Sequence, residues 1–386
     1  MYHRLLAERL KTSTRSILLL GPRQTGKSTL IKTLEPDLSI NLTFEHVFLD
    51  YSAQPGLLEK VVARERPRTV FIDEVQRLPS LLNTVQGMLD ESPRQYRFYL
   101  TGSSARKLKR GKANLLPGRV IQHQLGPLIH EELGEDLELD DALAFGTLPG
   151  IVTERDDRVR TDLLRTYAST YLKEEVQAEA LTRQIEGFAR FLFVAASKSG
   201  EFLDFAKAGS LAAISQKTSS RFFEILEDTL IVNRIDAYAA NETRRLVRHP
   251  KFYFFDNGVL NGLLRNFTLS EDRRGFLFEH FIVNQILIAN ATLGEPARLS
   301  TYRTEAGSEV DLIVEKAGET IGLEIKSGSR VASKDFSGLR SFSASHGRRR
   351  AGRSILLYSG NRAYTDGQVD VLPWRKALSE IMAFLR

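Results

Sequence analysis

The chain has 386 residues, more than one hydrophobic core usually organises, so two or three domains are expected. It contains no cysteine, which excludes disulfides, iron–sulfur clusters and thiolate zinc sites, so any metal would be a hard ion held by oxygen. The formal net charge of +6 suits a polyanionic partner. No apolar run reaches the roughly 18 residues of a membrane span, and we expect a cytoplasmic protein that does not contact a membrane.

Strand-like and helix-like patterns alternate in the first part of the chain. Helix-compatible segments such as 28–34 and 81–89 separate apolar runs of strand length. These runs lie at 16–20, 47–50, 70–73 and 98–101. Alternation of this kind predicts a parallel sheet covered by helices. We therefore expect a first α/β domain at residues 1–150.

A glycine-rich loop follows the first of these strands. It fits the pattern G-x-x-x-x-G-K-[ST] at every required position and stands between a strand and a helix, where the motif requires it. Its backbone N–H groups would cradle phosphates, Lys27 would reach the β- and γ-phosphate oxygens, and Ser28 would bind Mg²⁺. The predicted nucleotide-binding residues are Gly21, Pro22, Arg23, Gln24, Thr25, Gly26, Lys27, Ser28 and Thr29.

Acidic and polar residues end the next apolar runs. Asp73 would position the Mg²⁺ shell, and Glu74 beside it would polarise the attacking water. Thr101 and Ser103 would lie next to the γ-phosphate as sensor residues if their strand is adjacent to both the loop strand and the Asp73 strand. A helix N-cap at Ser103 or Ser104 is an alternative that is compatible with this role.

Two arginines are candidates for a role at a neighbouring subunit's site. A cationic side chain supplied in trans can stabilise the transition state of phosphoryl transfer. Arg119, and after it Arg106, could supply that charge. The alternative for each is an ordinary solvated arginine.

The middle of the chain, residues 151–262, is predicted to form a second domain. Strand-like runs are missing from 156–209, and apolar residues recur there at helical spacing, which indicates a helical connector. Three helices followed by a two-stranded ribbon are typical of a winged helix. The helical patterns lie at 202–205, 211–214 and 218–230, and the strand-like runs at 231–235 and 251–255.

A winged helix normally places its third helix in the DNA major groove. In this chain that helix would begin with Lys217 and Arg221, and the wing would carry Arg244, Arg245 and Arg248, all able to contact phosphates. A winged helix that binds proteins, with its charges simply solvated, is the alternative.

The last part of the chain, residues 263–386, returns to mixed helix and strand patterns and predicts a second α/β domain. Expected elements are a helix at 274–289, strands at 309–314, 320–325 and 354–358, and a closing helix from Trp374. Basic residues are concentrated after position 328. They could bind a phosphodiester backbone, or they could simply form a solvated face.

Carboxylates and a lysine stand on two of these strands. Glu324 and Lys326 are two apart and share a face, where they can converge with Asp311. This is the arrangement of a PD-(D/E)XK nuclease core, in which Asp311, Glu324 and the helical Glu279 would bind Mg²⁺ and Lys326 would orient or activate water. An exposed strand edge with alternating charges is the alternative.

The chain resembles a bacterial and archaeal family that joins an AAA-type ATPase domain to DUF4143. The likeness begins at 21–29, 49–50, 70–79 and 99–104, and it continues at 167–176, 249–258, 278–279 and 303–326. It implies an α/β fold class: a P-loop NTPase domain with a parallel sheet, then a helical and winged-helix domain, then an α/β restriction-endonuclease-like domain. It also implies ATP and Mg²⁺ as cofactors and a homo-oligomeric ring, with a hexamer as one candidate size, in which Arg119 would act in trans.

Three functions stay open on the sequence. The first is an ATPase that couples hydrolysis to DNA binding, translocation or remodelling, with branched DNA as one substrate. The second is an ATP-switched signalling or scaffold protein that binds protein partners. The third is an ATP-gated, metal-dependent DNA nuclease.

Overall fold

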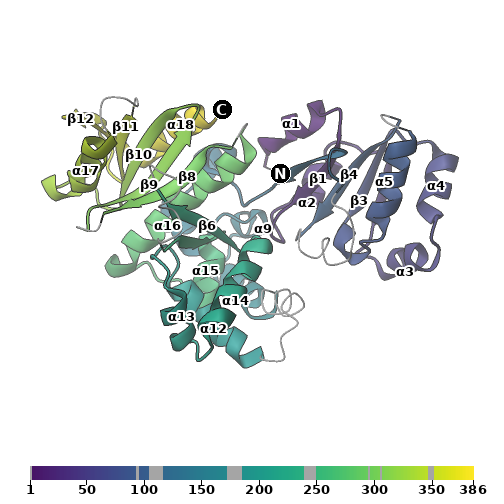
Figure 1. Ribbon diagram of the computed structural model, residues 1–386, viewed down its shortest axis with the longest axis horizontal. Helices are drawn as coiled ribbons and strands as arrows, with labels where there is room; N and C mark the ends of the chain where they lie inside the picture. The colour runs from purple at the N-terminus through teal and green to yellow at the C-terminus, as the bar shows by residue number, and fades with distance from the viewer. Residues whose placement is uncertain are drawn as a thin grey trace. The chain divides into compact units, whose positions relative to one another are not determined.

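The computed structural model describes residues 2–92, 95–103, 116–171, 185–238, 249–293, 296–304, 307–346 and 352–386. These form two compact units (Figure 1). Unit 1 comprises Met1–Leu128 with Asp228–Ile231, and unit 2 comprises Ile129–Glu227 with Val232–Arg386. Within the described ranges, no helix is both long and apolar enough to cross a membrane. The three-domain division at residues 150 and 262 stays a prediction.

Unit 1 is built on a five-stranded, all-parallel sheet with the order β2-β3-β4-β1-β5. Its strands are β1 (Ser16–Leu20), β2 (Leu38–Asn41), β3 (Thr69–Asp73), β4 (Arg97–Gly102) and β5 (Val120–Gln124). Figure 1 shows helices on both faces. They are α1 (Leu6–Thr12) and α2 (Lys27–Lys32) on one face, and α4 (Leu57–Glu65) and α5 (Leu81–Glu91) on the other. The parallel α/β fold expected from the sequence is confirmed.

The central strand β1 shows why apolar runs form this sheet. All five of its residues are buried, and alternate side chains point to opposite faces. Leu18 and Leu20 pack in the core beneath α4 and α5, whereas Ile17 and Leu19 pack beneath α1 and α2. A strand covered on both sides has no polar face, so its sequence is continuously apolar.

One predicted strand of this unit is wrong. Residues 47–50 lie inside helix α3 (Glu45–Ala53), and the edge of the sheet is instead formed by β2. Helix α3 has no buried residue, and Leu49 is 55% exposed. A short apolar run does not distinguish a strand from a surface helix, because only packing decides which of its side chains are covered. The sequence analysis also did not predict β5, an edge strand whose residues, VIQHQ, are mostly polar.

The first part of unit 2 is helical. Its longer helices are α8 (Leu139–Phe145), α10 (Asp157–Thr166), α12 (Ile185–Ser197), α13 (Phe205–Leu211), α14 (Gln216–Asp228), α15 (Asn257–Leu264) and α16 (Glu271–Thr292), with short helices α7 (His130–Leu133) and α9 (Pro149–Thr153). A π-helix spans Tyr167–Tyr171. The sequence placed helices at 202–205 and 211–214, but α13 lies between these positions. Asp204 caps it by accepting the N–H of Ala206 and Lys207.

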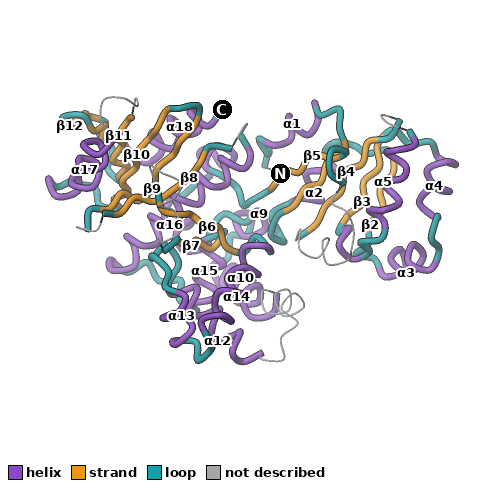
Figure 2. Tube along the Cα trace, viewed as in Figure 1, coloured by secondary structure: helices purple, strands orange, loops and turns teal. Residues whose placement is uncertain are grey.

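Unit 2 contains an eight-stranded mixed sheet with the order β12-β13-β11-β10-β9-β8-β6-β7. The strands are β6 (Val232–Ala237), β7 (Lys251–Phe254), β8 (Arg298–Arg303), β9 (Glu309–Lys316), β10 (Glu319–Lys326), β11 (Gly352–Tyr358), β12 (Tyr364–Asp366) and β13 (Val369–Pro373). Helices α17 (Ser337–His346) and α18 (Trp374–Leu385) accompany it. The antiparallel ribbon of β6 and β7 was expected, but β6 also pairs with β8 at Asp236↔Ser300 (Figure 2). The ribbon is therefore the edge of the carboxyl-terminal sheet.

The close approach of α15 to the end of α8 leads to a stability prediction. A Cβ atom added to Gly258 would lie 1.9 Å from the carbonyl oxygen of Phe145, a backbone atom that cannot turn aside. We expect Gly258→Ala to lower the free energy of unfolding by about 2–3 kcal/mol, the cost of overpacking a core, in urea denaturation followed by circular dichroism.

The matched control is Gly275→Ala on α16. The nearest atom to its added Cβ would be Ser327 Oγ, at an ordinary 3.6 Å. This change should be neutral or stabilise by up to about 1 kcal/mol, because alanine favours helix. Equal stability of the two variants would contradict the packing argument.

Candidate nucleotide site

The glycine-rich loop connects β1 to α2 in a conformation that its residue types permit. Gly26 has φ of 90° and immediately precedes α2, and Gln24 has φ of 62°. A Cβ at Gly21 would lie 2.2 Å from the Leu125 carbonyl oxygen, so only glycine fits there. The loop thus ends at the amino terminus of a helix, where backbone N–H groups lack intrahelical partners.

Lys27 is held inside this loop. Its side chain is buried, and Nζ donates hydrogen bonds to the carbonyl oxygens of Gly21 and Pro22, both at 2.8 Å. Thr25 Oγ1 donates to the same Pro22 oxygen at 2.9 Å. The ammonium group is therefore fixed against the backbone that would surround a phosphate.

The Asp73 carboxylate joins the ends of neighbouring strands. Its Oδ1 accepts hydrogen bonds from Ser28 Oγ at 2.7 Å and from Thr101 Oγ1 at 2.5 Å. Thr101 Oγ1 accepts in turn from the backbone N–H of Glu74 at 3.1 Å. Strand β4 lies between β3 and β1, which is the adjacency that the sensor prediction for Thr101 required. The structure brings Ser28, Asp73, Glu74 and Thr101 together.

Glu74 is connected to Ser103 through a residue that the sequence analysis missed. Glu74 has a left-handed backbone, with φ of 57°. Gln76 Nε2 donates to Glu74 Oε2 and also to Ser103 Oγ, the latter at 3.2 Å. Gln76 is nearly buried, and a Cβ on Gly102 would lie 2.8 Å from its Oε1. The signal was present in the sequence as a glutamine two residues after the acidic strand end.

Arg4 is a second residue that was missed. Its buried guanidinium donates to the Thr25 carbonyl oxygen at 2.9 Å, and to those of Gly126 and Pro127 at 2.8 and 3.2 Å. It thereby holds the glycine-rich loop to the segment that follows β5. No motif indicates this arginine, because its partners are backbone atoms more than twenty residues away along the chain.

The oxygen atoms at this edge suit a hard divalent cation. Mg²⁺ is commonly bound through one or two protein oxygen ligands together with substrate phosphates and water. The Ser28 hydroxyl and the Asp73 carboxylate lie side by side, as such a site requires. These residues fit Mg²⁺ when it accompanies a nucleotide.

Arg119 lies away from this loop within its own chain. It precedes β5, whose first residue pairs with Ser16 at the start of β1, whereas the loop follows the end of β1. Its guanidinium forms a two-point ion pair with Asp90 of α5, at 2.5 Å from Nε and 3.1 Å from Nη2. A role in trans stays a prediction, and Arg106 lies outside the described residues.

The predicted nucleic-acid residues are only partly described. Lys217 and Arg221 are exposed on α14 and stand four residues apart, which places them on one face of the helix. Arg244, Arg245 and Arg248 fall in 239–248, outside the described residues. Of the basic residues near the carboxyl end, Arg353 forms ion pairs with Asp370 and Glu380.

The four residues predicted for a nuclease-like core lie in one cluster of unit 2. Lys326 Nζ is 2.6 Å from Glu324 Oε1, and the Ile325 N–H donates to Asp311 Oδ2 at 2.8 Å. Burial raises the pKa of Asp311 well above its usual value, and the nearby Glu279 and Glu324 carboxylates raise it further. Burial likewise raises the pKa of Glu324, against the influence of Lys326.

Three further residues complete this cluster. Tyr253 OH donates to Glu279 Oε1 at 2.9 Å, and Lys251 Nζ lies 3.5 Å from the same oxygen and 2.9 Å from Glu309 Oε1. Sequence analysis gave none of the three a role here, because Tyr253 and Lys251 of β7 and Glu309 of β9 meet only through the tertiary fold.

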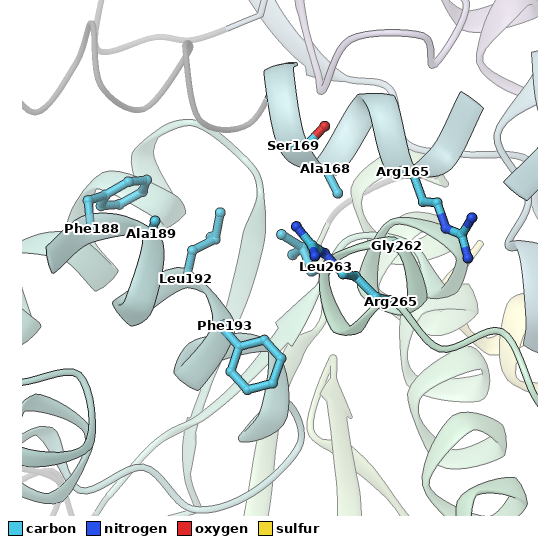
Figure 3. Close-up of a pocket in the computed structure, with 10 residues that line it drawn as sticks. All are labelled: Arg165, Ala168, Ser169, Phe188, Ala189, Leu192, Phe193, Gly262, Leu263 and Arg265. Atoms are coloured by element: carbon cyan, nitrogen blue, oxygen red, sulfur yellow. The ribbon is translucent and has the colours of Figure 1, made fainter. Parts of the chain in front are cut away.

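A separate pocket of about 770 Å³ lies among α10, the π-helix, α12 and α15 (Figure 3). Its walls combine apolar side chains with two guanidinium groups. They come from Arg165, Ala168, Ser169, Phe188, Ala189, Leu192, Phe193, Gly262, Leu263 and Arg265. None of the predicted site residues lines it.

Comparison with solved structures finds only distant similarity. A structure of Pif1 helicases on forked double-stranded DNA has 12% identity and a TM-score of 0.27, with 45% of this chain and 54% of that chain covered. A signal-transduction ATPase with a tetratricopeptide repeat sensor from Pyrococcus horikoshii has 10% identity and a TM-score of 0.27, over 73% and 44%. NtrX from Brucella abortus, in complex with ATP, has 12% identity and a TM-score of 0.26, over 57% and 66%. The chain thus spans about half of the first two structures.

Similarity at the level of sequence is more extensive. Uncharacterized proteins of Mycobacterium bovis and Mycobacterium tuberculosis are each 28% identical over 324 residues, which cover 80% of this chain and 70% of the relative. Family models match an AAA domain at residues 13–134 and two domains of unknown function, DUF8612 at 136–270 and DUF4143 at 274–377. The chain therefore carries an AAA domain of the P-loop ATPase kind at its amino end and a DUF4143 domain at its carboxyl end, with a DUF8612 domain between them.

Proposed function

We propose that the chain hydrolyses ATP in the presence of Mg²⁺ and couples this hydrolysis to DNA. The observation that carries the ATPase part is the hydrogen-bond network at the edge of the parallel sheet, where Ser28 and Thr101 both donate to Asp73 Oδ1. It brings the Ser28 hydroxyl, the Asp73 carboxylate and the Thr101 hydroxyl together next to the glycine-rich loop. The AAA domain match at 13–134 supports the same proposal.

Each residue has a distinct task in this proposal. Loop N–H groups bind the phosphate oxygens, and Lys27 exchanges its hydrogen bonds with the Gly21 and Pro22 carbonyls for the β- and γ-phosphates. Ser28 and Asp73 would hold Mg²⁺, which neutralises charge that develops on the phosphates.

Glu74 is suited to orient water for attack on the γ-phosphate. Its backbone N–H is fixed by Thr101, and its carboxylate is fixed by Gln76. A base held in one orientation needs no rearrangement at the moment of reaction, which is the source of its catalytic effect. We propose Gln76 and Ser103 as the residues that keep it in place.

DNA is the partner that the charge distribution favours. Lys217 and Arg221 share an exposed face of α14, the third helix before the β6–β7 ribbon, and the chain carries a net charge of +6. Exposed cations on one helix can contact phosphates of a duplex. The proposed assembly is a homo-oligomeric ring, with Arg119 of one subunit acting at the next.

Substitutions at the nucleotide site test the hydrolysis proposal. We expect Glu74→Gln to bind ATP normally but to lower kcat about 10²–10⁴-fold, the usual contribution of a positioned general base. Lys27→Ala should instead weaken nucleotide binding. Phosphate release and the binding of a fluorescent ATP analogue measure the two effects separately.

Glu65→Gln, on the exposed surface of α4, is the matched control and should retain full turnover. Normal kcat in Glu74→Gln would refute the assignment of the water-orienting residue. Absence of both adenine-nucleotide binding and phosphate release in the unmodified protein would refute the ATPase proposal itself.

Substitutions on α14 test the proposed DNA interaction. In Lys217→Ala/Arg221→Ala, affinity for duplex and junction DNA should fall. The slope of log K against log salt should decrease by about two, because two phosphates would no longer be neutralised by the protein. Fluorescence anisotropy over a salt series measures this, with ATPase stimulation by DNA recorded in parallel.

Lys376→Ala, an exposed lysine of α18, removes a positive charge elsewhere and should leave the salt slope unchanged. An unaltered slope in the double variant would show that α14 does not contact DNA. If the protein binds no DNA and DNA does not change its ATPase rate, the result would instead favour the scaffold function with a protein partner.

A further inference from the structure

A buried lysine lies inside the acidic cluster of unit 2. The Lys251 side chain is only 4% exposed, and its Nζ lies 2.9 Å from Glu309 Oε1 and 3.5 Å from Glu279 Oε1. The same nitrogen lies 5.0 Å from the centroid of the Phe202 ring. Carboxylates and an aromatic face are the neighbours that stabilise a cation away from water.

A nuclease-like core implies a divalent metal held by Glu279, Asp311 and Glu324, and the residues present do not fit one. In the part of the chain that the structure describes, no group of three or more His, Cys, Asp or Glu side chains could hold a metal ion. One oxygen of each carboxylate is already engaged by the protein. Tyr253 donates to Glu279, the Ile325 N–H to Asp311, and Lys326 to Glu324.

Cations of the protein itself lie within this cluster. Lys251 and Lys326 supply two positive charges to four carboxyl groups, those of Glu279, Glu309, Asp311 and Glu324. The two ammonium groups thus lie where a metal ion would otherwise supply positive charge.

We propose that Lys251 is the resident cation of this cluster, so that its ammonium group takes the place of the divalent metal of a nuclease-like core. Lys251 also has a mechanical role, because it joins β7 at the edge of the sheet to Glu279 of α16 and Glu309 of β9. Unit 2 then holds its acidic core together without metal and does not cleave DNA there. This inference is independent of the ATPase proposal.

The test compares the full-length, nucleotide-free protein with Lys251→Met, which keeps the length of the side chain but removes its charge. Melting temperature is measured with and without millimolar Mn²⁺. Binding of Mn²⁺ is measured separately by electron paramagnetic resonance. The unmodified protein should show no change in melting temperature with Mn²⁺. Lys251→Met should melt about 5–10 °C lower, and Mn²⁺ should restore most of this loss because it replaces the missing positive charge.

Three further variants locate the effect. Adding Asp311→Asn to Lys251→Met should abolish the response to Mn²⁺. Lys251→Arg, which retains a cation, should behave like the unmodified protein. Lys198→Met, which removes a half-exposed lysine paired with Glu201, should change little. If Lys251→Met does not fold, Lys251→Met/Glu309→Gln, which also removes the nearest carboxylate, replaces it.

Two outcomes would overturn the proposal. The first is a rise in the melting temperature of the unmodified protein with Mn²⁺ that Asp311→Asn abolishes, because an ion would then bind despite Lys251. The second is a Lys251→Met protein that melts like the original, or one whose lower melting temperature Mn²⁺ does not raise.

Discussion

The hydrogen bonds to Asp73 Oδ1 determine how the proposed catalytic edge of unit 1 is arranged. Ser28 and Thr101 donate to this one oxygen from either side, at 2.7 and 2.5 Å. The three residues come from three adjacent parallel strands or their continuations, and the carboxyl ends of such strands meet at one edge of the sheet. Thr101 also accepts the Glu74 N–H, so the orientation of the proposed base depends on the same network. The strand order therefore places most residues of the proposed site at one edge of the sheet.

Unit 2 uses charge differently. Asp73 and Thr101 in unit 1 are buried and joined by a hydrogen bond, whereas the buried Lys251 of unit 2 forms ion pairs with Glu279 and Glu309. Buried charges persist only when partners compensate them, and removing one partner leaves the others exposed to repulsion. The sheet adds a second connection, because β6 pairs with β8 and makes the ribbon continuous with the strands that carry the cluster. Strands β6 and β7 therefore belong to the same sheet as the strands that carry the acidic cluster.

Several errors of the sequence analysis have a common origin. Residues 47–50 have the composition of a buried strand but lie in a surface helix, and β5 is a strand despite its polar letters because it occupies the edge of the sheet. Helix α13 begins at Phe205, where the Asp204 side chain caps it, rather than at the apolar residues on either side. In each case the local apolar pattern was compatible with two structures and did not decide between them.

The chemistry of the nucleotide loop could be predicted from the sequence, because spacing between neighbours is enough to place glycines, Lys27 and Ser28 on one strand–loop–helix turn. Asp73, Glu74 and Thr101 were predicted as well, since the ends of apolar runs become the edge of a parallel sheet. Three further residues, Arg4, Gln76 and Lys251, were found only in the folded chain. The partners of Arg4 are backbone carbonyls and those of Lys251 are half-buried glutamates on other elements, so no spacing along the chain encodes these contacts. Gln76 contacts Glu74 only two residues away, but the sequence does not show that its side chain turns back to that carboxylate. Folding alone brings an edge strand, a helix and a hairpin together, and so places Lys251 beside Glu279 and Glu309.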